Sequence, residues 1–171
     1  MLSELSAAEL TELRSLLDER ACRTLIERYA YAVDWMNWPG LEALFWPEAH
    51  FDYGMWSGDR AAAVPWVAEL EEGYQRRLHM LASPRIEVTG DRARAEAGAI
   101  MYMRSATDDG VGRDDLILAR YQFEFERRER EWRIVGLRFL MHGAQNFPAT
   151  DQGGAPFFAD GLTPAHPLFA Q

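Results

Sequence analysis

The sequence predicts an α+β fold in which a curved, mostly antiparallel sheet wraps around N-terminal helices, as a cone-shaped α+β barrel with an internal pocket. The first observation is the order of the segments: helical periodicity comes first, and a strand, a further helix and four consecutive strands follow. The second is the alternation of apolar and polar residues in the later strands, which is typical of a sheet with one buried face. A sheet that curls around the long first helix leaves a cavity at its open end.

The first helix is expected over residues 6–36. Leucine, isoleucine, tyrosine and valine recur there at steps of three and four residues, which is the period of a helix with one buried face. Ser6 and Glu9 have the spacing of a capping box, in which each side chain bonds to the backbone N–H of the other residue. We therefore expect the helix to begin at this pair.

Two further helices are expected before the run of strands. The Trp-Pro-Gly sequence at 38–40 breaks the helical pattern, and a short second helix is expected over residues 41–45. A third helix is expected over residues 60–75, with Asp59 as its N-cap. Pro65 lies inside that range, so the helix either bends there or begins later.

Five strands are expected, one before the third helix and four after it. Their ranges are 50–56, 77–88, 92–105, 116–127 and 132–142. Alternation is clearest in the fourth of them, where isoleucine, tyrosine and phenylalanine face one way. A run of strands after a run of helices indicates α+β architecture rather than alternating α/β units.

The length of 171 residues suits one domain, which we place at 1–145. The remaining segment, 146–171, is rich in proline and glycine and predicts no regular element. It nevertheless carries large apolar side chains, which a purely disordered tail would not need. These side chains are Phe147, Phe157, Phe158, Leu162 and Phe169. We therefore expect the tail to pack on the domain or on a partner subunit.

Composition excludes several classes of function. The net charge of −9 disfavours nucleic acid and anionic membranes as partners, and no apolar run is long enough to cross a bilayer. The N-terminus lacks the basic start of a secretory signal, so we expect a cytoplasmic protein. All 18 basic residues are arginine, which excludes Schiff-base chemistry on lysine. Cys22 is the only cysteine and is expected to be a packed core residue; no pattern for a metal or cofactor is present, and none is expected.

Two titratable residues lie in apolar surroundings. His79 stands at the start of a predicted strand between apolar residues and is expected to be at least partly buried. Asp34 ends the first helix in an aromatic stretch, where a carboxylate needs a partner. A histidine is a suitable partner, because an aspartate fixes the tautomer of an imidazole and raises its basicity. A structural histidine and an aspartate that caps a turn are the alternative interpretations.

Three tyrosines are candidates to donate a hydrogen bond to a substrate oxygen. Tyr29 and Tyr31 lie on the first helix, and Tyr53 projects from the apolar face of the first strand. At about 100° per residue, Tyr31 lies about 60° around the helix from Asp34 and Tyr29 about 140° away, so ideal geometry favours Tyr31. For each of the three, an ordinary core or rim tyrosine is the alternative.

Aromatic residues are concentrated in one part of the chain. Nine of the 21 (Phe 9, Trp 6, Tyr 6) fall in residues 29–56, and this density suits a pocket for an aromatic ligand. Trp38 and Trp56 are therefore candidate substrate-binding residues. An aromatic core without a ligand is the alternative interpretation.

Two polar residues of the last strand complete the set of substrate-binding candidates. Strict alternation places Arg138 and His142 on the same face as Ile134. Arg138 is expected either to hold a substrate oxyanion or to pair with a carboxylate of the sheet, such as Glu124.

Three segments resemble a known family. LIERYAYAVDWMNWPGLEALFWPEAHFDYG is similar to the start of SnoaL-like domains in the nuclear-transport-factor-2-like superfamily, with Tyr29, Asp34 and Trp38 at the typical tyrosine, aspartate and tryptophan positions. LHMLASPRIEVTGDRARAEA matches the next feature, a histidine five residues before a proline, here His79 and Pro84. EWRIVGLRF resembles the closing strand of the family.

The resemblance extends over about residues 8–145 and implies particular roles. Family lyases similar to scytalone dehydratase and lindane dehydrochlorinase use an aspartate–histidine dyad in the pocket, and Asp34 and His79 fall on those two positions. The resemblance also favours Tyr29 over Tyr31 as the hydrogen-bond donor, against the ideal-helix geometry. Some dehydratase relatives carry a second histidine three residues after the first, where Ala82 stands in this sequence.

The resemblance thus implies a cofactor-free lyase acting on a small aromatic or polycyclic hydroxy compound. The reaction would eliminate water or a related leaving group, or release formaldehyde by a retro-aldol step, with His79 as the base and Tyr29 or Tyr53 as the donor. Isomerases, cyclases and the non-catalytic β subunits of ring-hydroxylating dioxygenases share the fold, so these functions, and that of a small-molecule binding domain, remain alternatives. A homo-oligomer, either a dimer or a trimer, is also expected.

Overall fold

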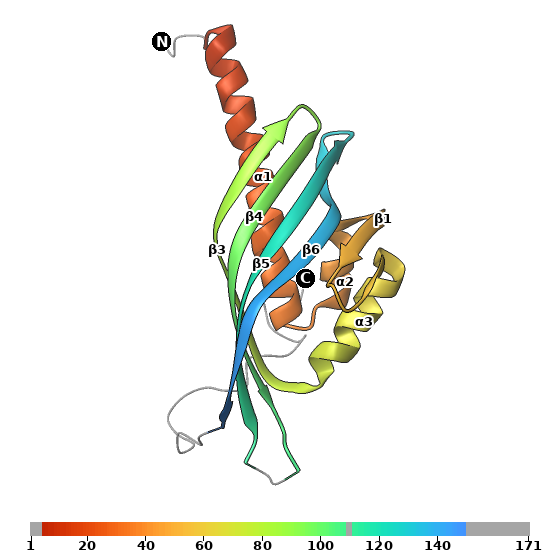
Figure 1. Ribbon diagram of the computed structural model, residues 1–171. Helices are drawn as coiled ribbons and strands as arrows, with labels where there is room; N and C mark the ends of the chain where they lie inside the picture. The colour runs from red at the N-terminus through yellow and green to blue at the C-terminus, as the bar shows by residue number, and fades with distance from the viewer. Residues whose placement is uncertain (1–4, 109–110, 150–171) are drawn as a thin grey trace.

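The computed structural model describes residues 5–108 and 111–149 (Figure 1). Its helices are α1 (Ala7–Asp34), α2 (Trp38–Ala43) and α3 (Arg60–Glu72). Its strands are β1 (Phe45–Asp52), β2 (Ser57–Asp59), β3 (Tyr74–Thr89), β4 (Arg92–Ser105), β5 (Arg113–Arg128) and β6 (Glu131–Pro148). The order of helices and strands confirms the predicted α+β class.

The six strands form one sheet in the order β2-β1-β6-β5-β4-β3. Neighbouring strands are antiparallel except β1 and β6, which are parallel. The four long strands β3–β6 twist together along the length of α1, while α2 and α3 lie at the side of β1 (Figure 1). The predicted curved, mostly antiparallel sheet around N-terminal helices is therefore confirmed.

The inner face of the sheet is built by alternation, most regularly in β4. Its inward side chains are small over the first half and larger over the second; they are Ala93, Ala95, Ala97, Ala99, Met101 and Met103. Alanine lets a helix approach a sheet closely, whereas longer side chains are needed where no helix fills the space. Cys22 of α1 is part of this core, and burial raises the pKa of its thiol to about 12, so it is a packed residue as expected.

Helix α1 begins with the predicted capping box between Ser6 and Glu9. Its residues 7–17 are exposed and extend beyond the end of the sheet (Figure 1). The first side chain that ties the helix to the sheet is Asp18, which accepts hydrogen bonds from Arg127 at 2.8 and 2.9 Å and from the Trp132 indole at 2.8 Å. The packed part of the helix therefore starts at this aspartate.

Replacing Asp18 by alanine is expected to lower the free energy of unfolding by about 2 kcal/mol, because one charged hydrogen bond is lost and the indole N–H of Trp132 loses its acceptor. Urea denaturation followed by tryptophan fluorescence measures the change. Glu12→Ala, at an exposed position of the same helix, is the control and should change stability by less than about 0.5 kcal/mol. Equal effects of the two substitutions would contradict the role of Asp18.

The boundaries of the second helix and the first strand differ from the prediction. Helix α2 starts at Trp38, capped by Asn37, because Pro39 falls in the first turn, where a missing backbone N–H does no harm. The chain then enters β1 at Phe45 rather than at residue 50. Pro47 lies inside β1, in the stretch where the pairing with β6 is irregular, so it removes no regular ladder hydrogen bond.

The β5–β6 pair is longer than predicted, and one short strand was missed. Strand β5 begins at Arg113, because Asp114 pairs with Arg104 across the ladder at 2.6 and 2.7 Å. Strand β6 runs on to Pro148, into the segment predicted to be an irregular tail. Strand β2 has three residues and carries too little pattern to be predicted. Residues 150–171, and with them the predicted packing of the tail, lie outside the described residues.

None of the helices in the described residues is long and apolar enough to cross a membrane.

Candidate functional site

The centre of the site is a hydrogen-bonded pair, Asp34 and His79. The Nδ1 atom of the imidazole lies 2.7 Å from Oδ1 of the carboxylate. Both residues are 7% exposed. The sequence prediction that these two residues are partners is therefore met in the geometry, within the range expected for a catalytic hydrogen bond.

The pairing follows from the position of β3 at the edge of the sheet. An edge strand has backbone N–H groups with no strand partner on one side, and a buried one must be satisfied in another way. The N–H of His79 donates to both carboxylate oxygens of Asp34 at 3.0 Å. The last residue of α1 thus holds both the backbone and the side chain of His79.

This arrangement determines which nitrogen of His79 is free to react. The carboxylate of Asp34 accepts hydrogen bonds only, so Nδ1 carries the proton of a neutral imidazole. Within the described residues no group is hydrogen-bonded to Nε2, and His79 lines a cavity beside the pair. Nε2 is therefore available to accept a proton.

The cavity has a volume of about 140 Å³ and lies between α1, α3 and the inner face of the sheet. Most of its wall is apolar or aromatic. Four of the lining residues are methionines: Met55, Met101, Met103 and Met141. The polar groups that reach it are Tyr29, Tyr53, Glu71, Tyr74, His79 and Tyr121. A small apolar cavity with a few convergent polar groups is typical of a binding site for a small molecule.

Two tyrosine hydroxyls meet at the cavity wall. The hydroxyl of Tyr29 lies 3.0 Å from that of Tyr53. Burial raises the pKa of Tyr29 and of Tyr53 above the ordinary value, so both stay protonated at neutral pH. Tyr29, which the resemblance favoured, lies in the cavity. Tyr31, which ideal helix geometry favoured, is 55% exposed and lines a second depression of about 340 Å³, which Asp34 and His79 also line.

A second buried ion pair, Glu71 with Arg77, was not predicted. Arg77 donates from Nε to the Glu71 carboxylate at 3.1 Å, and from Nη2 to the backbone carbonyls of Glu71 and Tyr74 at 2.7 Å. Burial raises the pKa of Glu71 above its ordinary value. The sequence signal was the four-residue step from Ala63 to Val67 to Glu71 along the buried stripe of α3. Because neighbouring glutamates of the same helix are exposed, the pattern did not distinguish Glu71 as buried.

The two candidate tryptophans pack beside the site rather than lining the cavity. Trp38 begins α2 and packs against the core. Trp56 stacks on Trp66 with ring centroids 4.9 Å apart, and Trp66 in turn contacts Tyr53. Trp56 therefore supports, through Trp66, the tyrosine that lines the cavity.

Arg138 and His142 lie on the outer face of the sheet, away from the cavity. The expectation that they share a face with Ile134 is wrong, because an extra residue at 135 interrupts the ladder and reverses the alternation. Ile134 is buried, whereas Arg138 is exposed and pairs with Asp52 at 3.0 Å. His142 is the extra residue of a second irregularity and is exposed as well.

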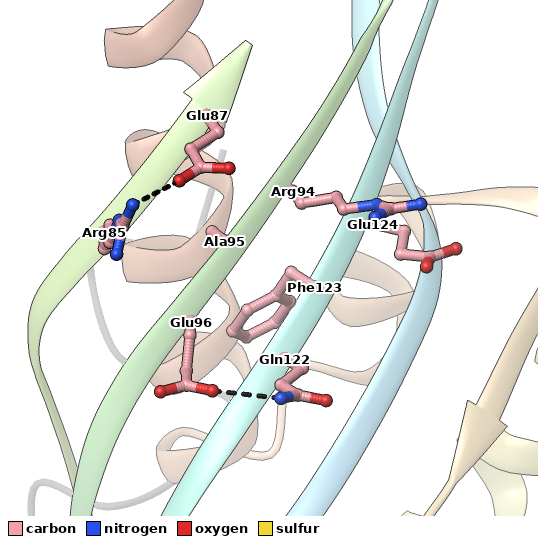
Figure 2. Close-up of a pocket in the computed structure, with 8 residues that line it drawn as sticks. All are labelled: Arg85, Glu87, Arg94, Ala95, Glu96, Gln122, Phe123 and Glu124. Carbon is pink, nitrogen blue, oxygen red and sulfur yellow. Dashed lines mark hydrogen bonds and ion pairs between the residues drawn. The ribbon is translucent and has the colours of Figure 1, made fainter. Parts of the chain in front are cut away.

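A larger depression of about 460 Å³ lies on the outer face of strands β3–β5 (Figure 2). Its side chains are mostly charged. Arg85 pairs with Glu87 at 2.6 Å, and Gln122 donates a hydrogen bond to Glu96 at 2.9 Å. No buried titratable side chain points into it. The aromatic cavity beside Asp34 and His79 is therefore the better candidate site.

Comparisons with known proteins identify relatives of this architecture. Hexachlorocyclohexane dehydrochlorinase LinA type 2 has a TM-score of 0.75 and 19% identity, over 84% of this chain and 99% of its own. LinA type 3 from Novosphingobium barchaimii has a TM-score of 0.72 and 20% identity, over 86% and 98%. A proposed scytalone dehydratase from Novosphingobium aromaticivorans has a TM-score of 0.68 and 17% identity, over 83% and 97%.

These structures establish a shared fold, and the distant structural relatives include lyases. A search of curated proteins gives no match. A scan of protein-family models matches the SnoaL-like domain over residues 14–138. That match spans most of the chain, and the protein therefore belongs to the SnoaL-like domain family of the NTF2-like fold.

Proposed function

We propose that this protein is a cofactor-free lyase that eliminates water, or a related leaving group, from a small aromatic hydroxy compound. The observation that carries the proposal is the buried Asp34–His79 pair, 2.7 Å apart, in which His79 also lines an apolar cavity. An elimination needs a base at a carbon-bound hydrogen and a means of assisting the leaving group. Both are functions of side chains in a dry cavity.

In the proposed reaction Nε2 of His79 removes a proton from a carbon next to an electron-withdrawing group. The imidazolium that forms is stabilised by the carboxylate of Asp34, which also keeps the ring in its orientation. One hydroxyl of the Tyr29–Tyr53 pair donates a hydrogen bond to a carbonyl or phenol oxygen of the substrate, where negative charge develops. The same base would also serve a retro-aldol release of formaldehyde.

The size of the cavity narrows the substrate class. A volume of about 140 Å³ is close to that of an engineered apolar cavity that binds benzene. A single ring with one or two small substituents therefore fits better than a polycyclic compound. The names of the relatives, dehydrochlorinase and proposed scytalone dehydratase, also describe eliminations and support the reaction class.

A screen of single-ring hydroxy and halogenated compounds tests the proposal. Purified protein is incubated with each compound in deuterated water, and products are followed by mass spectrometry and NMR. We expect loss of water or halide, with exchange of the carbon-bound hydrogen. Protein with His79→Ala is the control, and equal rates in the two would place the chemistry elsewhere. A rearranged product without a leaving group would instead identify an isomerase.

A further inference from the structure

The cavity contains a second carboxyl group, and we propose that Glu71 is the general acid of the site, which protonates the leaving hydroxyl as His79 removes the proton from carbon. This inference rests on the proposed lyase function. It assigns the residue that gives a proton to the leaving group, in addition to the base that takes the proton from carbon. Water is a poor leaving group unless its oxygen receives a proton as the bond to carbon breaks. A site with a base alone therefore leaves the reaction incomplete.

Glu71 is held at the cavity by the packing of α3. It is the last member of the buried stripe Ala63, Val67 and Glu71, and it is 4% exposed. Arg77 binds one carboxyl oxygen, Oε2, at 3.1 Å and uses its Nη2 group on two backbone carbonyls. In the part of the chain that the structure describes, Oε1 has no hydrogen-bond partner, although the residue lines the cavity. One oxygen is thus anchored and the other is free to meet a ligand.

The charges around Glu71 decide how readily it holds a proton. Removal from water disfavours the carboxylate and is the largest influence on its pKa, which is raised. The positive charges of His79, in its protonated form, and of Arg77 act in the opposite direction, and the negative charge of Asp34 adds to the rise. The titratable groups that interact with it are His79, Arg77 and Tyr74 of β3, Asp34 of α1, Tyr121 of β5, and Tyr53. Glu71 therefore holds its proton to higher pH than an exposed glutamate does.

The tyrosines are less suited to this step. Burial raises the pKa of Tyr29 and of Tyr53 away from neutral pH, so each gives up its proton less readily than an exposed tyrosine. A general acid is most effective when its pKa lies near the pH of the reaction. The upward shift moves a carboxyl toward that pH and a phenol away from it. The tyrosines therefore serve as hydrogen-bond donors and Glu71 as the proton donor.

The proposed step is balanced in protons and electron pairs. Nε2 of His79 takes the hydrogen from carbon, and the electron pair of that C–H bond forms the new C=C bond. The C–O bond breaks, and its oxygen takes the proton from Oε1 of Glu71 and leaves as water. The site then holds an imidazolium and a carboxylate. Transfer of the Nε2 proton to Glu71, through the water formed, restores the starting state.

The first test is a titration that needs no substrate. Protein with carbon-13 in its glutamate carboxyl groups is titrated by NMR, and Glu71→Gln assigns the signal. We expect the Glu71 signal to titrate above the ordinary value of 4.5. A midpoint at or below 4.5 would show that Glu71 has no proton to give and would overturn the assignment.

The second test compares two leaving groups on one ring compound, hydroxide and halide. Glu71→Gln keeps an oxygen for Arg77 but has no acidic proton. We expect it to slow loss of water by about 10²–10⁴-fold and loss of halide by less than about tenfold, because halide leaves without a proton. Glu72→Gln, at the exposed neighbouring position, is the matched control and should change neither rate.

The outcomes distinguish a failure of the Glu71 assignment from a failure of the proposed lyase function. Equal slowing of both leaving groups by Glu71→Gln, in an otherwise active enzyme, would show that the residue only shapes the cavity. Wild-type protein that eliminates neither group would contradict the lyase function itself. The titration would then still decide whether Glu71 holds a proton near neutral pH.

Discussion

Replacing Asp34 by asparagine is expected to lower kcat by about 10³–10⁴-fold with little change in fold. The carboxylate accepts hydrogen bonds from Nδ1 and from the backbone N–H of His79. Asparagine keeps an oxygen for the backbone N–H, but its amide group then presents a donor to Nδ1. The imidazole responds by moving its proton to Nε2, and the nitrogen that faces the cavity is no longer a base.

The tautomer of His79 distinguishes this mechanism from a general loss of structure. Long-range nitrogen–proton NMR spectra should show the proton on Nδ1 in the wild type and on Nε2 in Asp34→Asn. Asp91→Asn, in the exposed turn between β3 and β4, is the control and should keep both the tautomer and the rate. A variant with the altered tautomer and an unchanged rate would show that the pair is structural.

Replacing Arg77 by methionine is expected to lower the free energy of unfolding by about 3–5 kcal/mol where Glu71 is ionised, the range for breaking a buried ion pair. The substitution leaves the Glu71 carboxylate without its cation and two backbone carbonyls without a donor. In a chain of this length the melting temperature should fall by on the order of 10 °C. Arg76→Met, at the neighbouring position that faces outward, should have a much smaller effect.

The decrease in the free energy of unfolding caused by Arg77→Met should depend on pH, and its direction can be stated. The pKa of Glu71 is higher in the folded protein than in the unfolded chain. The contribution of Glu71 to stability is therefore complete at pH values below its pKa in the unfolded chain. That contribution is lost as the pH rises through its pKa in the folded protein. Without Arg77 the ionised carboxyl is a buried charge with no cation bonded to it. The deficit relative to the wild type should therefore be larger at pH 8 than at pH 5. The double variant Glu71→Gln/Arg77→Met should remove this difference, and a deficit independent of pH would contradict it.

Local features of the fold were predictable because they depend on neighbours in sequence. The capping box at Ser6, the N-cap at Asp59 and the alternation of β4 all occur where the pattern placed them. The irregularities of β6 were not predictable, because an extra residue in a ladder is visible only against the partner strand. Arg138 and His142 were therefore assigned to the wrong side of the sheet.

The candidate site was predictable in part. Asp34 and His79 are 45 residues apart, so spacing alone gives no distance between them, and the pairing was expected from chemical need and from the family resemblance. Glu71 was missed for a different reason. Glutamate at the end of a helix is usually solvated, and its burial depends on β3 folding back so that Arg77 covers it. The one periodic signal, the four-residue step from Ala63 to Val67 to Glu71, was obscured by the exposed glutamates on the same helix.

The four methionines of the cavity wall have a consequence for how this pocket can change during evolution. A thioether side chain is unbranched and rotates about three bonds, so the wall can repack around ligands of different outline with little loss of contact. The dyad and the buried glutamate are fixed by hydrogen bonds, whereas the surface that faces the ring of a ligand is adaptable. Exchanging Met101 or Met103 for other apolar residues is therefore a route to new substrates that leaves the acid–base groups in place.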